Sequence, residues 1–133
     1  MANVYELTHG FQNVVHDLHQ LVFPNVLTCM AFIAYDGARL IGVHFTQMDQ
    51  SVARIQGAWA RVQAISGGPH DVYVAGPAWN VSLLTALHPM AAALRGALTP
   101  SGVDVRATLA AGVVTVEHAP AGAGGPWVPL VMA

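Results

Sequence analysis

The chain has 133 residues, of which 54% are hydrophobic and 9% are charged, and its formal net charge is −2. This length and apolar content exclude a disordered chain and are typical of a single domain over residues 1–133. The cations are five arginines, with no lysine, and they form no cluster, so the basic footprint of a nucleic-acid-binding protein is missing.

Hydrophobic periodicity and turn residues predict the secondary structure. In chain order, we expect a helix over 11–22 ended by Pro24-Asn25, strands over 26–35 and 40–45, a helix over 50–65 and a strand over 71–75. A helix over 80–98, kinked or broken near His88 by Pro89, follows, then strands over 103–109 and 113–118 and an edge strand over 127–132. This order, α-β-β-α-β-α-β-β-(β), predicts an α+β fold with an antiparallel-rich sheet or sandwich core flanked by helices.

No apolar run approaches the roughly 18 residues of a membrane-spanning helix. The first residues, Met1 to Glu6, contain no basic region of a secretory signal. A single cysteine, Cys29, cannot form an internal disulfide. We therefore expect a cytoplasmic protein, or one delivered into another cell without a cleaved signal peptide.

Cys29 and His44 are the candidate catalytic pair. Asp36-Gly37 between two apolar runs is a strong hairpin signal, and a two-residue turn there would pair Tyr35 with Ala38. Paired position numbers would then add to 73, which places Cys29 opposite His44 with Cβ atoms about 5 Å apart. An imidazole at that distance can take the proton of a thiol, whose thiolate is a nucleophile. The alternative is structural, because a cysteine in an apolar strand is usually a small buried hydrophobic residue.

Two segments resemble the CheD chemoreceptor glutamine deamidases. They are Thr28-Cys29-Met30-Ala31-Phe32-Ile33-Ala34-Tyr35-Asp36 and Ile41-Gly42-Val43-His44-Phe45. The same Cys-then-His order is found in the cytotoxic necrotizing factor toxins and in the Burkholderia lethal factor. Further along, Val72-Tyr73-Val74-Ala75-Gly76-Pro77-Ala78 is similar to the "VFGGA" strand of CheD. As an order of elements, the resemblance covers residues 26 to about 131.

The resemblance implies a protein glutamine deamidase in which Cys29 is the nucleophile and His44 the base, with no metal and no cofactor. The substrate would be a glutamine on another protein. The family has a glycine where this chain has Leu27, and a histidine-orienting threonine where it has Phe23. The orienting or oxyanion-binding role would therefore fall to Asn25, Thr28 or Thr46, or to a backbone carbonyl.

Other functions remain open at the level of sequence. The first half also resembles a roadblock or profilin-like domain, which would make the chain a non-catalytic scaffold or an inactive deamidase relative; the helix expected over 80–98 argues against this. His16 and His19 could ligate a metal, although an exposed helix face explains them as well. The low charge predicts a homodimer or hetero-complex with an interface near Trp79 or Trp127.

Overall fold

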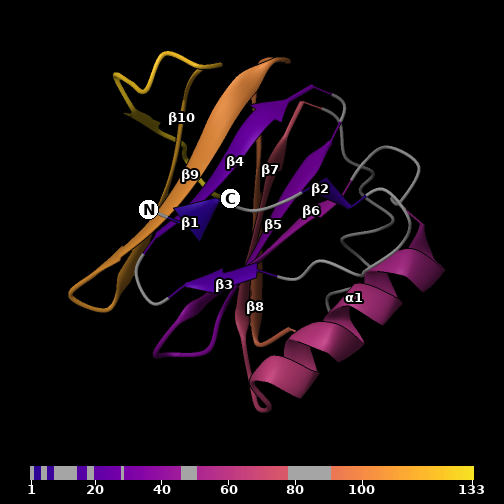
Figure 1. Cartoon of the computed structure of the whole chain (residues 1–133). Helices are drawn as coiled ribbons and strands as arrows, with labels where there is room; N and C mark the ends of the chain where they lie inside the picture. The colour runs from indigo at the N-terminus through magenta and orange to yellow at the C-terminus, as the bar shows by residue number, and fades with distance from the viewer. Residues whose placement is uncertain are drawn as a thin grey trace.

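Backbone hydrogen bonds divide the strands of the computed structural model into two sheets (Figure 1). The structure describes residues 2–3, 6–7, 15–17, 20–27, 29–45, 51–77 and 91–133. Within these ranges, sheet A consists, in spatial order, of β1 (Ala2–Asn3), β4 (Gln20–Val26), β9 (Val103–Ala110), β10 (Val113–Pro120) and β11 (Val128–Pro129). Sheet B consists of β2 (Glu6–Leu7), β6 (Leu40–Phe45), β5 (Met30–Tyr35), β7 (Asp71–Gly76) and β8 (Ala93–Leu98), with β3 (Val15–Asp17) paired to β6.

The pairings within both sheets are mostly antiparallel. The parallel ones are β1 with β4, β2 with β6 and β7 with β8. One helix, α1 (Val52–Ile65), accompanies the two sheets in the described part of the chain. The predicted α+β class with antiparallel-rich sheets is therefore confirmed.

The three layers enclose two hydrophobic cores. A helix-side core, which includes Phe32, Phe45 and Trp59, lies between α1 and sheet B. An inter-sheet core, which includes Phe23 and Val105, lies between sheets B and A. Both faces of sheet B are thus covered, which explains why its central strands are apolar at nearly every position rather than at alternate ones.

Helix α1 begins and ends close to the predicted bounds. Ser51 is its N-cap, and its Oγ accepts a hydrogen bond from the Arg54 N–H at 3.3 Å. Its buried residues recur at intervals of three and four and face sheet B: Ile55, Ala58, Trp59 and Val62. The Ser66 N–H donates to the Val62 carbonyl where the helix ends. Helical periodicity therefore located this element correctly.

The predicted strands over 103–109 and 113–118 are confirmed as the hairpin β9–β10. Ala110 pairs with Val113, so the turn consists of Ala111 and Gly112. Both have positive φ, at 51° and 74°, as a two-residue type I′ turn requires. The strands over 40–45 and 71–75 are confirmed as β6 and β7.

The helix predicted over 11–22 is wrong where the structure describes the chain. Residues 15–17 form β3, and β4 begins at Gln20. Pro24 and Asn25 do not end a helix; they lie at a register shift inside β4, where Asn25 has φ 50°. The reason is non-local pairing, because β4 forms a ladder with β9, about 80 positions later in the chain, and such tertiary contacts override local helical spacing.

Two further predictions need correction. The single strand expected over 26–35 is divided, because β4 ends at Val26 in sheet A and β5 begins at Met30 in sheet B. The helix expected over 80–98 is wrong over residues 93–98, which form β8 parallel to β7; residues 78–90 lie outside the described part. Here again the pairing with a distant strand outweighs the recurrence of leucine and alanine at helical spacing.

The segment after β10 connects the two sheets. Pro129 and Val128 pair with β10, and the Leu130 N–H donates to the Val116 carbonyl at 2.8 Å. Ala133 then exchanges two backbone hydrogen bonds with Gly96 of β8, at 3.0 and 3.1 Å. Of the edge strand predicted over 127–132, only Val128–Pro129 forms a strand, β11. No helix in the described ranges is long and apolar enough to cross a membrane.

Candidate functional site

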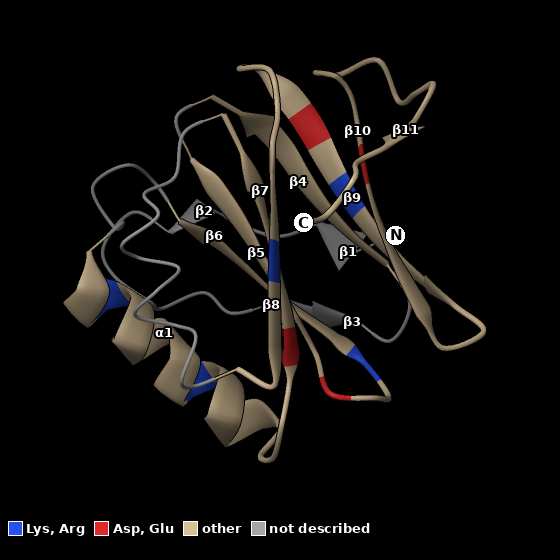
Figure 2. Cartoon of the chain, turned by 180° about the vertical axis from the view of Figure 1, so that it is seen from behind, with Lys and Arg blue, Asp and Glu red and all other residues tan. Residues whose placement is uncertain are grey.

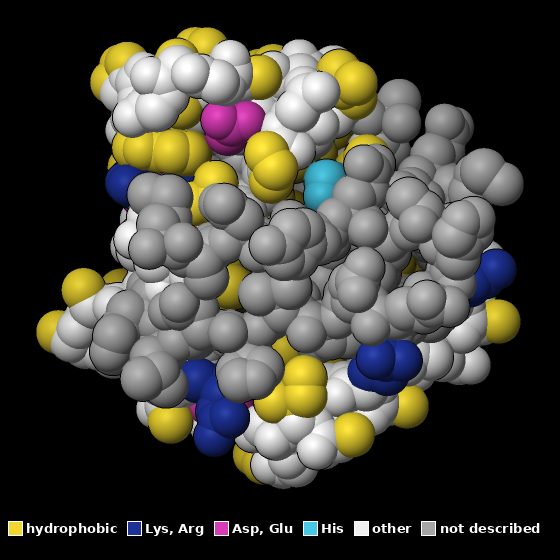
Figure 3. Space-filling model, in the orientation of Figure 1, with side chains coloured by type: hydrophobic (Ala, Val, Ile, Leu, Met, Phe, Trp, Pro, Cys, Tyr) yellow, Lys and Arg dark blue, Asp and Glu magenta, His cyan; other side chains and the backbone are white. Residues whose placement is uncertain are grey.

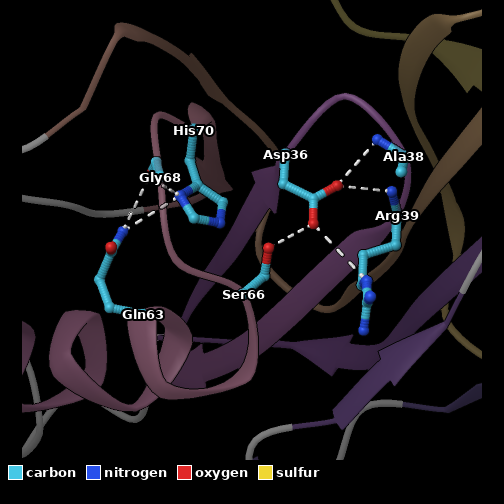
Figure 4. Close-up of polar contacts among 7 residues, drawn as sticks. All are labelled: Asp36, Ala38, Arg39, Gln63, Ser66, Gly68 and His70. Atoms are coloured by element: carbon cyan, nitrogen blue, oxygen red, sulfur yellow. Dashed lines mark hydrogen bonds and ion pairs between the residues drawn. The ribbon is translucent and has the colours of Figure 1, made fainter.

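The turn between β5 and β6 sets the register on which the candidate pair depends. The Asp36 carboxylate accepts hydrogen bonds from the N–H groups of Ala38 and Arg39 at 2.8 and 2.7 Å (Figure 4). It also accepts a hydrogen bond from Ser66 Oγ and lies 3.6 Å from Arg39 Nε. Partial burial disfavours the charged carboxylate, but these hydrogen bonds and the Arg39 charge outweigh it and lower the pKa of Asp36.

The predicted turn at Asp36-Gly37 is wrong: the Asp36 N–H donates to the Arg39 carbonyl at 3.4 Å, so the chain turns one position later, at Gly37 and Ala38. Tyr35 therefore pairs with Leu40 rather than with Ala38, and the hydrogen bonds from the Ala38 and Arg39 N–H groups to the Asp36 side chain stabilise this turn. Paired position numbers add to 75 instead of 73, and His44 lies opposite Ala31. The direct pairing of Cys29 with His44 does not occur.

A shift of two positions nevertheless keeps side chains on the same face of a sheet. Cys29 packs in the inter-sheet core together with Phe23. The imidazole of His44 meets the Phe23 ring edge to face, with centroids 6.1 Å apart. Cys29, just before β5, and His44 on β6 therefore both face sheet A, on a diagonal rather than directly opposite each other. Both are buried, with 6% and 2% of their surfaces exposed.

The segment that leads from β4 to Cys29 is held by residues from other elements. The Asn25 N–H donates to Asp104 Oδ1 at 2.8 Å. The Val26 carbonyl accepts from the Gly102 N–H at 2.9 Å, and the Leu27 carbonyl accepts from Ser101 Oγ at 2.9 Å. A loop fixed in this way can hold a reactive side chain in one position.

Gly76, at the end of β7, lies against the backbone of Cys29. A Cβ atom at position 76 would come within 2.5 Å of the Cys29 carbonyl oxygen, closer than a carbon and an oxygen atom can approach. The Gly76 carbonyl also accepts a hydrogen bond from the Thr99 N–H at 3.0 Å. Only glycine fits there, so the cysteine backbone is placed directly against sheet B.

Of the three residues predicted to orient His44 or to bind the oxyanion, the structure describes only Asn25. The Asn25 backbone N–H is engaged by Asp104, so it is not available to an oxyanion. Thr28 and Thr46 lie outside the described residues. Sequence reasoning missed Asp104, whose partner Asn25 is 79 positions away; the only signal was a lone acid within the apolar pattern of 103–109.

Other features of the chain add no second site. Among the described residues, no group of three or more His, Cys, Asp or Glu side chains could hold a metal ion; the side chains of His16 and His19 lie outside that part. Among the described residues, the charged ones are scattered over strands and helix rather than clustered (Figure 2), and the coloured part of the face in Figure 3 carries no continuous basic or acidic patch. Trp79 is outside the described ranges, whereas the half-buried Trp127 lies under the Arg106 guanidinium, 4.4 Å from its ring centroid.

Comparisons with known proteins leave the family open. No family model, no curated protein and no solved structure matches the chain significantly.

Proposed function

We propose that the chain is a protein glutamine deamidase in which Cys29 is the nucleophile and His44 is its base. The observation that carries the proposal is the placement of both side chains on one face of sheet B, beside a segment fixed by contacts from β7 and β9. The resemblance of residues 28–36 and 41–45 to the CheD deamidases supports the same pair.

The reaction follows from the chemistry of the two groups. The Cys29 thiol transfers its proton to His44, and Sγ attacks the carboxamide carbon of a substrate glutamine. The C–N bond breaks as the imidazolium gives its proton to departing ammonia, which leaves a thioester. Water, deprotonated by His44, attacks the thioester carbon, the C–S bond breaks, and glutamate and the thiol are released. Backbone N–H groups near Cys29 would bind the oxyanion.

Phe23 also supports the proposal and marks where this chain departs from the family. It stands six positions before Cys29, where CheD has the threonine that orients the histidine, and its ring lies against His44. The same position thus contacts the imidazole. Here it does so through an aromatic edge, which restricts the orientation of the ring by packing rather than by a hydrogen bond.

The rate at which iodoacetamide modifies the folded protein tests the proposal without knowledge of the substrate. A thiolate paired with an imidazolium forms below the usual thiol pKa of about 8.5, so Cys29 should react faster at neutral pH than a free thiol. His44→Ala should slow the reaction by about tenfold or more, because the thiolate loses its counter-ion. Cys29→Ser should fold normally and release no ammonia from glutamine-bearing proteins.

His70→Ala is the matched control. His70 is also a buried histidine, with 1% of its surface exposed, but it packs against Trp59 in the helix-side layer. Its removal should lower stability and leave the alkylation rate of the folded protein unchanged. A Cys29 that stays unmodified in folded wild-type protein would refute the proposal.

The second candidate is a non-catalytic scaffold, which the deep burial of Cys29 and His44 favours. One argument against a roadblock-like domain is weaker, because β8 forms where part of the helix over 80–98 was expected. One argument for it is also weaker, because β3 and β4 form where the first helix of that resemblance was expected. Large hydrophobic side chains on the surface could serve a partner or a second copy: Leu27, Leu98, Val113, Val128 and Val131. An inert Cys29 together with a dimer in sedimentation analysis would establish this candidate.

A further inference from the structure

Asp104 is a buried acid on the face of β9 that points away from the inter-sheet core. Its neighbours Val103 and Val105 pack in that core, so alternation along the strand directs Asp104 to the opposite face. Only 9% of its surface is exposed. A carboxylate buried to this degree requires hydrogen-bond donors to compensate for lost water.

Both oxygens of the Asp104 carboxylate accept from backbone N–H groups, one at the bulge of β4 and one in the loop after β10. Oδ1 accepts from Asn25 at 2.8 Å, and Oδ2 accepts from Gly122 at 3.0 Å. One carboxylate therefore ties the segment that precedes Cys29 to the glycine-rich segment that follows β10. Hydrogen bonds to a charged acceptor are the stronger kind, so this link is well suited to fix both segments.

The contact at Asn25 lies where the backbone departs from a regular strand. Asn25 has φ 50°, in the left-handed region, which asparagine adopts more readily than other residues with a Cβ, and it lies at the register shift of β4. At this shift the chain leaves sheet A for sheet B and Cys29. The hydrogen bond from the Asn25 N–H to the Asp104 carboxylate restrains this conformation from outside the strand.

We infer that Asp104 is a positioning residue for the candidate catalytic pair, acting on Cys29 through the bulge at Asn25. This inference depends on the proposed function. Without the Asp104 acceptor, the bulge would relax toward a regular strand, and Cys29 would move relative to His44 on the neighbouring strand. The thiol would then titrate more like a free thiol, although the fold is retained.

Asp104→Asn tests this, because the substitution keeps the shape of the side chain but turns one acceptor into a donor. The matched control is Glu117→Gln on the same face of the adjacent strand, where Glu117 pairs with Arg106. Hydrogen exchange at the Asn25 and Gly122 amides should be at least about tenfold faster in Asp104→Asn only. The pH midpoint of Cys29 alkylation should rise toward about 8.5 in Asp104→Asn and stay in place in Glu117→Gln.

A second pair of variants tests the same link from its other end, and remains informative if Asp104→Asn does not fold. Asn25→Ala strains the left-handed position, whereas Asn25→Gly adopts it without a Cβ clash. The alkylation midpoint should therefore rise more in Asn25→Ala than in Asn25→Gly.

The results of these experiments distinguish failure of the positioning role of Asp104 from failure of the proposed function. A reactive wild-type Cys29 whose midpoint is the same in Asp104→Asn, or equal midpoints in the two Asn25 variants, would overturn the positioning role and leave the proposed function standing. An inert wild-type Cys29 would overturn the proposed function, and the positioning role with it.

Discussion

Asp36 stabilises the turn that sets the register of β5 and β6. Its carboxylate engages two backbone N–H groups of the turn and also reaches Ser66 at the end of α1. The turn, both strands and the helix are thereby joined by one side chain (Figure 4). Its effect is therefore larger than that of an ordinary surface acid.

We predict that Asp36→Asn lowers the free energy of unfolding by about 1–3 kcal/mol at neutral pH, since the charged acceptor is lost. Because folding lowers the pKa of Asp36 below its usual 3.8, the carboxylate adds stability above that pH. This stability is lost as the pH falls through the lower folded-state pKa. Urea unfolding at several pH values should show the wild-type advantage shrinking below about pH 4. Asp71→Asn, at the half-exposed start of β7, is the control and should show a smaller difference.

Gly76 gives a second prediction for a single residue. In Gly76→Ala the new Cβ would meet the Cys29 carbonyl oxygen at 2.5 Å and the Met30 Cα at 3.4 Å. Backbone atoms cannot yield as a side-chain end can, so we expect a loss of about 1–3 kcal/mol in urea unfolding. In the control Gly67→Ala, the nearest atom is 3.9 Å away, and the change should stay within about 0.5 kcal/mol. Equal effects of the two substitutions would contradict the close approach at Cys29.

At the scale of elements, the turn of the hairpin β9–β10 contains a residue, Ala111, that is poorly suited to its backbone conformation. Ala111 has φ 51°, which costs about 1 kcal/mol for a residue with a Cβ and no polar side chain. Asparagine would be favoured at this position, since Asn-Gly is the preferred type I′ pair. We predict that Ala111→Asn raises the melting temperature by a few degrees, about 0.5–1 kcal/mol. Gly112→Ala, at φ 74°, should lower it, and a rise in both variants would argue against this turn.

How far the sequence predicts an element depends on where its hydrogen-bond partners lie. Helix α1 and the hairpin β9–β10 are local, so periodicity and turn residues were sufficient. Strands β4 and β8 pair with distant strands, and their residues had the spacing of amphipathic helices. In β4, three consecutive apolar residues, Leu21, Val22 and Phe23, are all buried. Such an unbroken apolar run is the feature of this segment that indicates a buried strand rather than an amphipathic helix.

The catalytic role of Cys29 and His44 stays a prediction, and their direct pairing was predicted wrongly. Asp36-Gly37 is typical of a two-residue turn, and the sequence does not reveal that the Asp36 side chain engages Ala38 and Arg39 instead. The environment of Cys29 could not be predicted at all. Gly76 meets the Cys29 backbone, and Asp104 binds Asn25 four positions before Cys29, only because the strands that carry them pair across the sheets.

At the scale of the whole molecule, the segment after β11 closes the side of the sandwich between β10 and β8. The half-buried Leu130 packs against the inter-sheet core, whereas the next residue, Val131, is 90% exposed. We predict that Leu130→Ala lowers the free energy of unfolding by about 1–2 kcal/mol and that Val131→Ala changes it by less than about 0.5 kcal/mol. Urea unfolding of the two variants compares them directly, and similar losses would mean that this segment does not seal the core.

The separation in sequence between β4 and β9 has a consequence for how the molecule assembles. The contacts that hold the segment before Cys29 join residues 74 and 79 positions apart, and contacts of such long range form late because closing the loop costs entropy. A chain in which α1 has packed on sheet B but sheet A is still open would leave the thiol exposed to solvent. Protein refolded from denaturant in air should therefore collect disulfide-linked dimers through Cys29, whereas protein exposed to the same air after folding should not.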